Sequence, residues 1–176
     1  MKPELSADFA DYTRELGDGF TPPGPELEFL YRLIANVAPP IEVGSVERGL
    51  LKIIPITGGR FEGPRLRGTV LPVGADWNTT SHLVPTTRHI DTRYILKTDD
   101  GAIISLSTRG YATQTGEVLK RRTAREPVDP GEYYFKQHLF FDTAAEEYLW
   151  LNNVVAFGCV ISQKTPGVIY DAWIVR

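Results

Sequence analysis

Short β-rich runs, broken repeatedly by glycine and proline, constrain this chain more than any other feature of its sequence. The clearest pair occupies residues 89–98 and 102–109, joined by Asp99-Asp100-Gly101. An Asp-Gly step between two such runs is a strong signal for a β-hairpin. Further runs of this kind cover residues 27–34, 49–57, 66–71, 133–141, 153–162 and 167–175, with a short one around Phe61. The sequence therefore predicts a mainly β protein of about eight or more strands.

Two helices are predicted beside the strands. The first covers residues 6–16, where Ser6 can cap the helix and Phe9, Tyr12 and Leu16 share one face. The second begins with the capping-box form Thr143-Ala144-Ala145-Glu146 and runs for about two turns, to Trp150 and Leu151. We expect both helices to lie at the periphery of the domain.

The arrangement of these elements predicts one domain. A chain of 176 residues is the size of a single domain, and residues 17–25 hold three glycines and three prolines, as a linker does. We therefore divide the chain into an N-terminal helix and linker (1–25) and a β domain (26–176). The strands are compatible with a sandwich or a closed barrel. Closure removes exposed edges, so we expect a single antiparallel β-barrel.

Composition argues against several classes of partner. The formal net charge is −3, and the densest basic run, Lys120-Arg121-Arg122 followed by Arg125, is interpreted as a solvated loop or strand end rather than a nucleic-acid patch. No apolar segment approaches the length of a membrane span or a signal peptide, so we expect a cytoplasmic protein. The single cysteine, Cys159, lies in an apolar run and is predicted to be a buried structural thiol. Homo-oligomer formation through the N-terminal helix stays open.

Several short motifs in a fixed order resemble a known family. They are Gly58-Gly59-Arg60-Phe61-Glu62-Gly63-Pro64, Arg67-Gly68-Thr69-Val70-Leu71-Pro72, Gly74-Ala75-Asp76-Trp77, Asp91-Thr92-Arg93-Tyr94, Thr98-Asp99-Asp100-Gly101, Arg109-Gly110, Pro130-Gly131-Glu132-Tyr133-Tyr134-Phe135 and Trp150-Leu151-Asn152. In this order they resemble the family called domain of unknown function 3237, from about Leu27 to Val175. The resemblance implies a β-barrel similar to those of allene oxide cyclase and dirigent proteins. It implies no agreed activity, although that wider class of barrels includes cofactor-free cyclases and isomerases.

Alternation along residues 89–98 divides their side chains between two faces. One face carries His89, Asp91 and Arg93, and the other carries Thr92 and Tyr94. If the first face lines the barrel lumen, an aspartate two residues from a histidine can tune it for acid–base catalysis. If that face points outward, the same residues form a solvent-exposed ion-pair stripe. The sequence leaves both placements open.

Further candidate catalytic groups come from the neighbouring runs. Glu62 lies between glycines, where its carboxylate can act as a base or cap a turn. Arg109 can hold a carboxylate or an enolate oxygen, or pair with Asp91 or Glu62 as a structural bridge. A tyrosine hydroxyl such as that of Tyr94 can steady an oxyanion. The predicted catalytic residues are therefore Glu62, His89, Asp91, Tyr94 and Arg109.

Aromatic residues indicate a second set, which would bind the substrate. Asp76 and Trp77 follow a glycine turn, and Tyr133, Tyr134 and Phe135 begin a strand. Aromatic side chains at a barrel rim can form a ligand wall, or they can be ordinary core. His82 and His138 match no metal-ligand spacing, and no phosphate-binding loop or nucleophile elbow is present. We therefore predict no metal site and no nucleotide or flavin cofactor.

These residues favour a cofactor-independent cyclase or isomerase. Its substrate would be a small, largely apolar metabolite of secondary metabolism, converted by acid–base catalysis in the barrel lumen. Two alternatives remain: a barrel that binds such a molecule without changing it, and a filled barrel with a structural, oligomeric role. Convergence of titratable groups on an open lumen would favour the enzyme.

Overall fold

Nine β-strands make up most of the chain in the computed structural model, which describes residues 23–124, 126–162 and 167–176. Neighbouring strands all run antiparallel. They are β1 (Leu27–Val37), β2 (Ile41–Val46), β3 (Gly49–Glu62), β4 (Arg67–Thr80), β5 (Thr87–Thr98), β6 (Ile103–Gln114), β7 (Tyr133–Asp142), β8 (Val155–Ser162) and β9 (Gly167–Val175). The predicted mainly β class is confirmed. The helix predicted over residues 6–16 lies outside the described residues.

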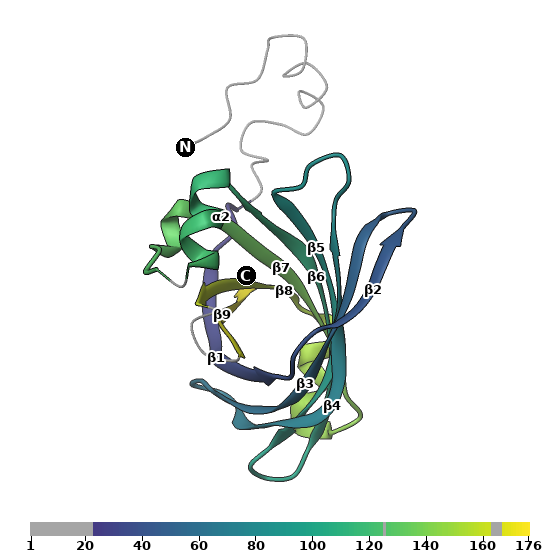
Figure 1. Cartoon of the computed structure of the whole chain (residues 1–176). Helices are drawn as coiled ribbons and strands as arrows, with labels where there is room; N and C mark the ends of the chain where they lie inside the picture. The colour runs from purple at the N-terminus through teal and green to yellow at the C-terminus, as the bar shows by residue number, and fades with distance from the viewer. Residues whose placement is uncertain (1–22, 125, 163–166) are drawn as a thin grey trace, which may run out of the picture.

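Pairing between β1 and β3 closes the sheet into a barrel. The strands follow the order β1-β9-β8-β7-β6-β5-β4-β3-β2, and β1 also pairs with the second half of β3. Eight strands therefore form a ring, while β2 pairs with the first half of β3 and projects from it (Figure 1). This confirms the barrel over the sandwich. The strand β2 was missed because its residues 41–46 are mostly exposed and show no buried face.

Strict alternation sorts the side chains of β7 between lumen and solvent. Phe135, Gln137, Leu139 and Phe141 are buried, whereas each residue between them is exposed. Successive side chains of a strand point to opposite faces, so one run of sequence supplies both the inner and the outer wall. The same rule fixes which candidate functional residues reach the lumen.

The predicted second helix is present in altered form. Residues Glu146–Asn153 form a 3₁₀ helix, η3, whose N-cap is Ala145 and has no side-chain cap. Thr143 does not form the predicted capping box. Its hydroxyl donates to the Ile103 carbonyl at 2.8 Å and accepts from the Ala145 amide at 3.1 Å. These contacts connect the start of the η3 segment to Ile103, the first residue of β6.

A helix also forms where the sequence suggested a loop. The basic run belongs to α2 (Gly116–Thr123), which Thr115 caps by accepting from the Val118 amide, and a short 3₁₀ turn, η2 (Pro130–Glu132), follows. The Arg121 guanidinium donates to Glu132 at 2.6 Å. Periodicity did not reveal this helix because Val118 is its one buried residue. No helix in the described part of the chain is long and apolar enough to cross a membrane.

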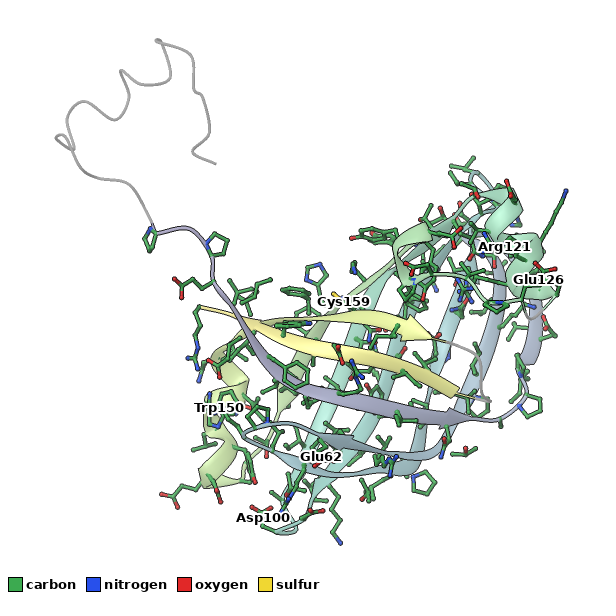
Figure 2. All side chains as sticks on the ribbon, turned by 90° about the vertical axis from the view of Figure 1, so that its left-hand side faces the viewer. Glu62, Asp100, Arg121, Glu126, Trp150 and Cys159 are labelled. Atoms are coloured by element: carbon green, nitrogen blue, oxygen red, sulfur yellow. The ribbon has the colours of Figure 1, made fainter. Side chains whose placement is uncertain are left out.

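The two ends of the barrel differ. Trp150 and Asp100 mark the η3 end, and Arg121 and Glu126 mark the α2 end (Figure 2). Large buried side chains fill the η3 end; they include Leu30, Phe61, Leu66, Leu96, Ile104, Phe141 and Leu151. The predicted burial of Cys159 was wrong: its side chain is only partly buried, because the inward positions on either side of it belong to Gly158 and Val160.

Candidate functional site

The α2 end of the lumen is hollow. A cavity of about 250 Å³ lies among the final residues of β1 and β4 and the first residues of β5, β7 and β9. Its wall is mainly apolar, with a few polar side chains among them. The lining residues are Ala35, Val37, Ala38, Pro40, Ile54, Ile56, Asp76, Asn78, Arg88, Ile90, Thr92, Tyr94, Thr108, Phe135, Gln137, Gly167, Val168 and Tyr170. A mostly apolar hollow with a few convergent polar groups is the usual form of a small-molecule site.

Asp76 is the carboxyl group of this cavity. Pairing of β4 with β5 is interrupted between Asp76–Thr92 and Thr79–His89. Within the interruption the Asp91 amide donates to Asp76 Oδ1 at 3.2 Å, and Asn78 Nδ2 donates to Oδ2 at 3.0 Å. The carboxyl is thereby held in one orientation by the strand next to it.

Burial decides the ionisation of Asp76. Desolvation raises its pKa above the ordinary aspartate value, against the opposing hydrogen bonds of Asn78, Thr92 and the Asp91 amide and the charge of Arg88. The charged form of a carboxyl loses hydration in an apolar wall, and the protonated form does not. Asp76 is therefore a stronger base than an exposed aspartate and a better match to acid–base work near neutral pH.

This raised pKa predicts a pH-dependent stability. The pKa of Asp76 is higher in the folded state than in the unfolded state. The free energy of unfolding therefore falls as pH rises from the unfolded-state pKa to the folded-state pKa, and this destabilisation stays constant at higher pH. The variant Asp76→Asn abolishes the titration, and Asn78 can reverse its amide to keep the hydrogen bond. We expect its thermal midpoint to exceed that of the wild type at pH 7, with a difference that shrinks toward pH 4. Calorimetry across that range measures it, and a lower midpoint at pH 7 contradicts it.

Arg88 gives the cavity a positive charge. Within the part of the chain that the structure describes, no hydrogen bond or ion pair engages its guanidinium, which lies 5.8 Å from the centre of the Phe135 ring. Desolvation lowers its pKa, as does the charge of Arg122, while Asp76 opposes them. An arginine stays cationic under such shifts. Its donors are therefore available to a negative or oxygen-bearing ligand.

Three tyrosine hydroxyls, on Tyr31, Tyr94 and Tyr170, form a hydrogen-bonded chain beside the cavity. The Tyr94 and Tyr170 hydroxyls are 2.7 Å apart, and Tyr170 is 3.3 Å from the Tyr31 hydroxyl. Burial raises the pKa of all three, so each keeps its proton at neutral pH. Tyr94 and Tyr170 line the cavity, and Tyr31 lies behind them in the core.

Glycines on either side of Gln137 make room for its side chain. Gln137 pairs with Gly110 on β6 and with Gly158 on β8. A Cβ at Gly158 would lie 3.0 Å from the Gln137 side chain and 3.0 Å from the Tyr170 ring. Because Gly158 has no side chain, the Gln137 side chain and the Tyr170 ring can both pack against its backbone.

Of the ten predicted site residues, three line this cavity: Asp76, Tyr94 and Phe135. Asp76 was predicted as a substrate contact, and the raised pKa of its partly buried carboxyl also suits acid–base chemistry. Trp77 and Tyr134 point outward and are 38% and 54% exposed, because they alternate with inward neighbours. Tyr133 lies beyond the lining; Arg122 covers its ring, and its hydroxyl donates to the Ile161 carbonyl at 2.7 Å.

Of the two placements that the sequence left open for the face carrying His89 and Asp91, the structure has the outer one, and Arg109 likewise lies outside the lumen. All three lie on the outer face, where the backbone of Asp91 lies opposite that of Arg109 in the pairing of β5 with β6. Asp91 is also 3.9 Å from Arg93, and the His89 ring packs edge-on against Tyr111 at 5.1 Å. The exterior ion-pair stripe is the placement that the structure supports, because Ile90, Tyr94 and Leu96 take the buried face of β5.

Glu62 also lies outside the lumen (Figure 2). It borders an open cleft of about 670 Å³ on the outer surface, together with Arg60 and Arg67. Strand alternation explains this placement, since Phe61 points into the core and its neighbours cannot. The predicted carboxylate–histidine–arginine set therefore does not converge on the lumen.

Several lining residues escaped sequence reasoning: Asn78, Arg88, Thr108, Gln137 and Tyr170. One available signal was the greater apolarity of the set that contains Ile90, Tyr94 and Leu96, which marks the inner face of β5 and places Arg88 on it. No comparable local signal identifies Gln137 or Tyr170. In the described residues, no three His, Cys, Asp or Glu side chains are grouped to hold a metal ion.

Comparison with known proteins agrees with this architecture. A family model described as "Protein of unknown function (DUF3237)" matches residues 25–175. The chain belongs to this family. The resemblance seen in the sequence motifs is thus confirmed, and the DUF3237 match spans nearly all of the described barrel.

Individual DUF3237 relatives add detail. A UPF0311 protein of Rhodopseudomonas palustris is 31% identical over 135 residues, which cover 76% of this chain and 86% of the relative. The crystal structure of a β-barrel-like protein from Acinetobacter baumannii shares 42% identity with a TM-score of 0.77, covering 89% of this chain and 99% of that one. The hydroalkoxylation enzyme phnH of Penicillium herquei is 31% identical over 140 residues, covering 80% of this chain and 77% of its own. An enzyme is therefore among the relatives of this barrel.

Proposed function

We propose that this protein is a cofactor-independent cyclase that adds a hydroxyl group across a carbon–carbon double bond of a small, largely apolar metabolite. The observation that carries the proposal is the partly buried Asp76 carboxyl, with its raised pKa, inside a mainly apolar cavity. It shares this cavity with the Arg88 guanidinium, which has no hydrogen bond or ion pair among the described residues. Kinship with a hydroalkoxylation enzyme supports the same chemistry, because that name describes addition of O–H across C=C.

The proposed step needs one group that both accepts and returns a proton. Asp76 as carboxylate takes the proton of the substrate hydroxyl while the oxygen forms a bond to one alkene carbon. The π electron pair moves to the other carbon, which receives the proton from Asp76. One O–H and one C=C are consumed, one C–O and one C–H form, and Asp76 ends as it began. No electrons leave or enter the substrate.

The surrounding residues lower the barrier in two ways. The Arg88 cation stabilises the negative charge that develops on the substrate hydroxyl oxygen. The low polarity of the cavity wall strengthens that attraction. A cavity of about 250 Å³ also limits the conformations of a flexible substrate, so that hydroxyl and alkene lie close together. Protonation at a neighbouring carbon without ring closure would give an isomerase with the same residues.

Isotope incorporation tests this proposal. We expect the protein to convert 2-allylphenol, or its ring-substituted analogue 3-allyl-4-hydroxyacetophenone, to a cyclic ether in D₂O with one deuterium on carbon. Proton NMR and mass spectrometry measure both the ring closure and the label. Saturable binding of these compounds without product or label contradicts the proposal and indicates a barrel that only binds its ligand. Incorporation of deuterium without ring closure indicates the isomerase.

A further inference from the structure

A row of ring side chains crosses four strands on the outside of the barrel, where β1 and β9 face the viewer in Figure 2. It consists of Phe29 on β1, Trp173 on β9, Phe157 on β8 and His138 on β7, each directly opposite the next. Trp173, Phe157 and His138 each lie between buried neighbours and therefore point away from the lumen. Phe29 borders the open outer cleft, and its ring meets that of Trp173 edge-on at 5.4 Å.

A second, apolar row lies beside the first. Leu27, Val175 and Val155 are paired across β1, β9 and β8, two residues along from the ring side chains. Phe140 extends this row on β7, where its ring stacks on His138 at 6.3 Å. Leu27, Phe140 and Val155 are each more than half exposed. The two rows together form the outer apolar face, and a contiguous exposed surface of this kind marks an interaction site.

Cations border the outer apolar face at β6 and β7. Arg109 lies opposite His138, and Lys136 is the next outward residue of β7. Neither side chain takes part in a hydrogen bond or an ion pair within residues 23–124, 126–162 and 167–176. Asp91, opposite Arg109 on β5, is 3.9 Å from Arg93, so this corner keeps an excess of positive charge. A partner that fits is apolar along one side and negatively charged at the end that reaches β6.

The N-terminal residues 1–22 of this chain have both properties. They lie outside the described residues, and their sequence predicts the helix over residues 6–16 with Phe9, Tyr12 and Leu16 on one side. They hold five Asp and Glu residues against one Lys and one Arg, so their side chains carry a net charge of −3. The segment is thus apolar on one side and acidic overall.

The dimensions of the segment suit the outer apolar face. The described chain starts at Pro23 and enters the barrel at Leu27, which is itself part of that face. A helix over residues 6–16 is about 16 Å long, and four adjacent strands span roughly 14 Å. Residues 17–25 can extend over roughly 30 Å. The end of the helix near Leu16 can therefore lie over β1 while its other end reaches β7.

We propose that residues 6–16 dock as an amphipathic helix on the outer apolar face of their own chain, with the apolar side on the two rows and Asp8 toward Arg109 and Lys136. Docking removes exposed side chains such as Phe140 from water together with the apolar side of the helix, which stabilises the contact. The proposal is independent of the reaction in the cavity, because this face lies on the other side of the sheet from the lumen.

Hydrogen exchange of the full chain, followed by mass spectrometry, tests the docking. We expect the amides of residues 6–16 to be protected in the wild type and to exchange about tenfold or more faster in Phe9→Ser/Leu16→Ser, which lacks most of the apolar side. Ala7→Ser/Ala10→Ser is the matched control, since it places two serines away from that side of the same helix. Its exchange should stay within about twofold of the wild type.

A second pair of variants tests the place of docking. Phe157→Ser removes the ring at the centre of the outer apolar face and should release residues 6–16 to the same extent. Tyr111→Ser removes an exposed aromatic residue of β6 outside the two rows and should leave the protection unchanged.

The thiol of Cys159 reports on the same place without a change in the barrel. It is the next outward residue after Phe157 on β8 and is partly buried, so a helix on the two rows restricts access to it. We expect Phe9→Ser/Leu16→Ser to raise several-fold the rate at which Cys159 reacts with a thiol reagent.

Three outcomes overturn the proposal. The first is equally fast exchange of residues 6–16 in the wild type and in Phe9→Ser/Leu16→Ser. The second is protection that survives in Phe157→Ser, or, if that variant does not fold, an unchanged rate at Cys159 in Phe9→Ser/Leu16→Ser. The third is protection that is lost on dilution of the wild type, because the segment then covers a second copy of the chain.

Discussion

Asp76→Asn is expected to lower kcat for a hydroxyalkene substrate about 10²- to 10⁴-fold, the range for loss of a positioned acid–base group. Asparagine has nearly the shape of the protonated carboxyl and keeps the hydrogen-bonding distance to Asn78 and the Asp91 amide. It cannot accept the hydroxyl proton, so binding should persist while the chemical step is lost. Steady-state kinetics with a parallel titration of the substrate measures the two effects separately.

Asp91→Asn is the matched comparison, because it changes the next carboxylate along this part of the sheet. Asp91 lies on the outer face beside Arg93 and opposite Arg109, so we expect kcat within about twofold of the wild type. A large loss in Asp91→Asn with none in Asp76→Asn would reverse the structural assignment and restore the outer residues as the catalytic set. The acid limb of the kcat/KM profile should also lie above the ordinary aspartate range, since burial raises the pKa of Asp76.

Gly59→Ala is expected to destabilise the barrel by about 3–5 kcal/mol, the combined scale of backbone strain and overpacking. Gly59 lies opposite Ala35 where β1 pairs with β3, and its φ of +148° is one that side chains rarely adopt. An added Cβ would lie 2.0 Å from the Ile34 carbonyl oxygen, so the two strands that close the barrel must separate. Chemical denaturation monitored by circular dichroism measures the change.

Gly44→Ala distinguishes the clash from the backbone strain. Gly44 has a φ of +106°, yet nothing lies within 4 Å of a Cβ built there. We expect this variant to lose only about 1–2 kcal/mol, from strain alone. Equal losses in the two variants would mean that the close approach of β1 to β3 does not limit the stability of the barrel.

Local chemistry made much of the fold predictable. The Asp99-Asp100-Gly101 turn between two β-rich runs became the β5–β6 hairpin, and most other runs became strands. Errors arose where an element has almost no buried face: α2 buries Val118 alone, and β2 is mostly exposed. Pattern-based reasoning needs an apolar stripe, and neither element has one.

Prediction of the site was weaker because it depended on one binary choice. Alternation along β5 separates Asp91 from Tyr94 with certainty, but it does not say which of the two faces is inside. The catalytic hypothesis required the charged face to line the lumen, and the sequence left that placement open. Burial of Ile90 and Leu96 stabilises the fold, whereas burial of unpaired charges costs free energy, so the apolar face lies inside. Hydrophobic packing decided which face of β5 points into the barrel, and the charged residues of the strand lie on the other face.

The sequence by itself determined that the chain forms antiparallel strands, where the central hairpin turns, and which side chains share a face, because turn geometry and the two-residue period are local properties. Only the tertiary structure decided that β1 meets β3, that the η3 end is filled and the α2 end hollow, and that Asp76, Arg88, Tyr94 and Tyr170 surround one cavity. These features depend on hydrogen bonds and packing between residues far apart in the chain. A cavity is the volume that such packing leaves unfilled, so no single segment encodes it.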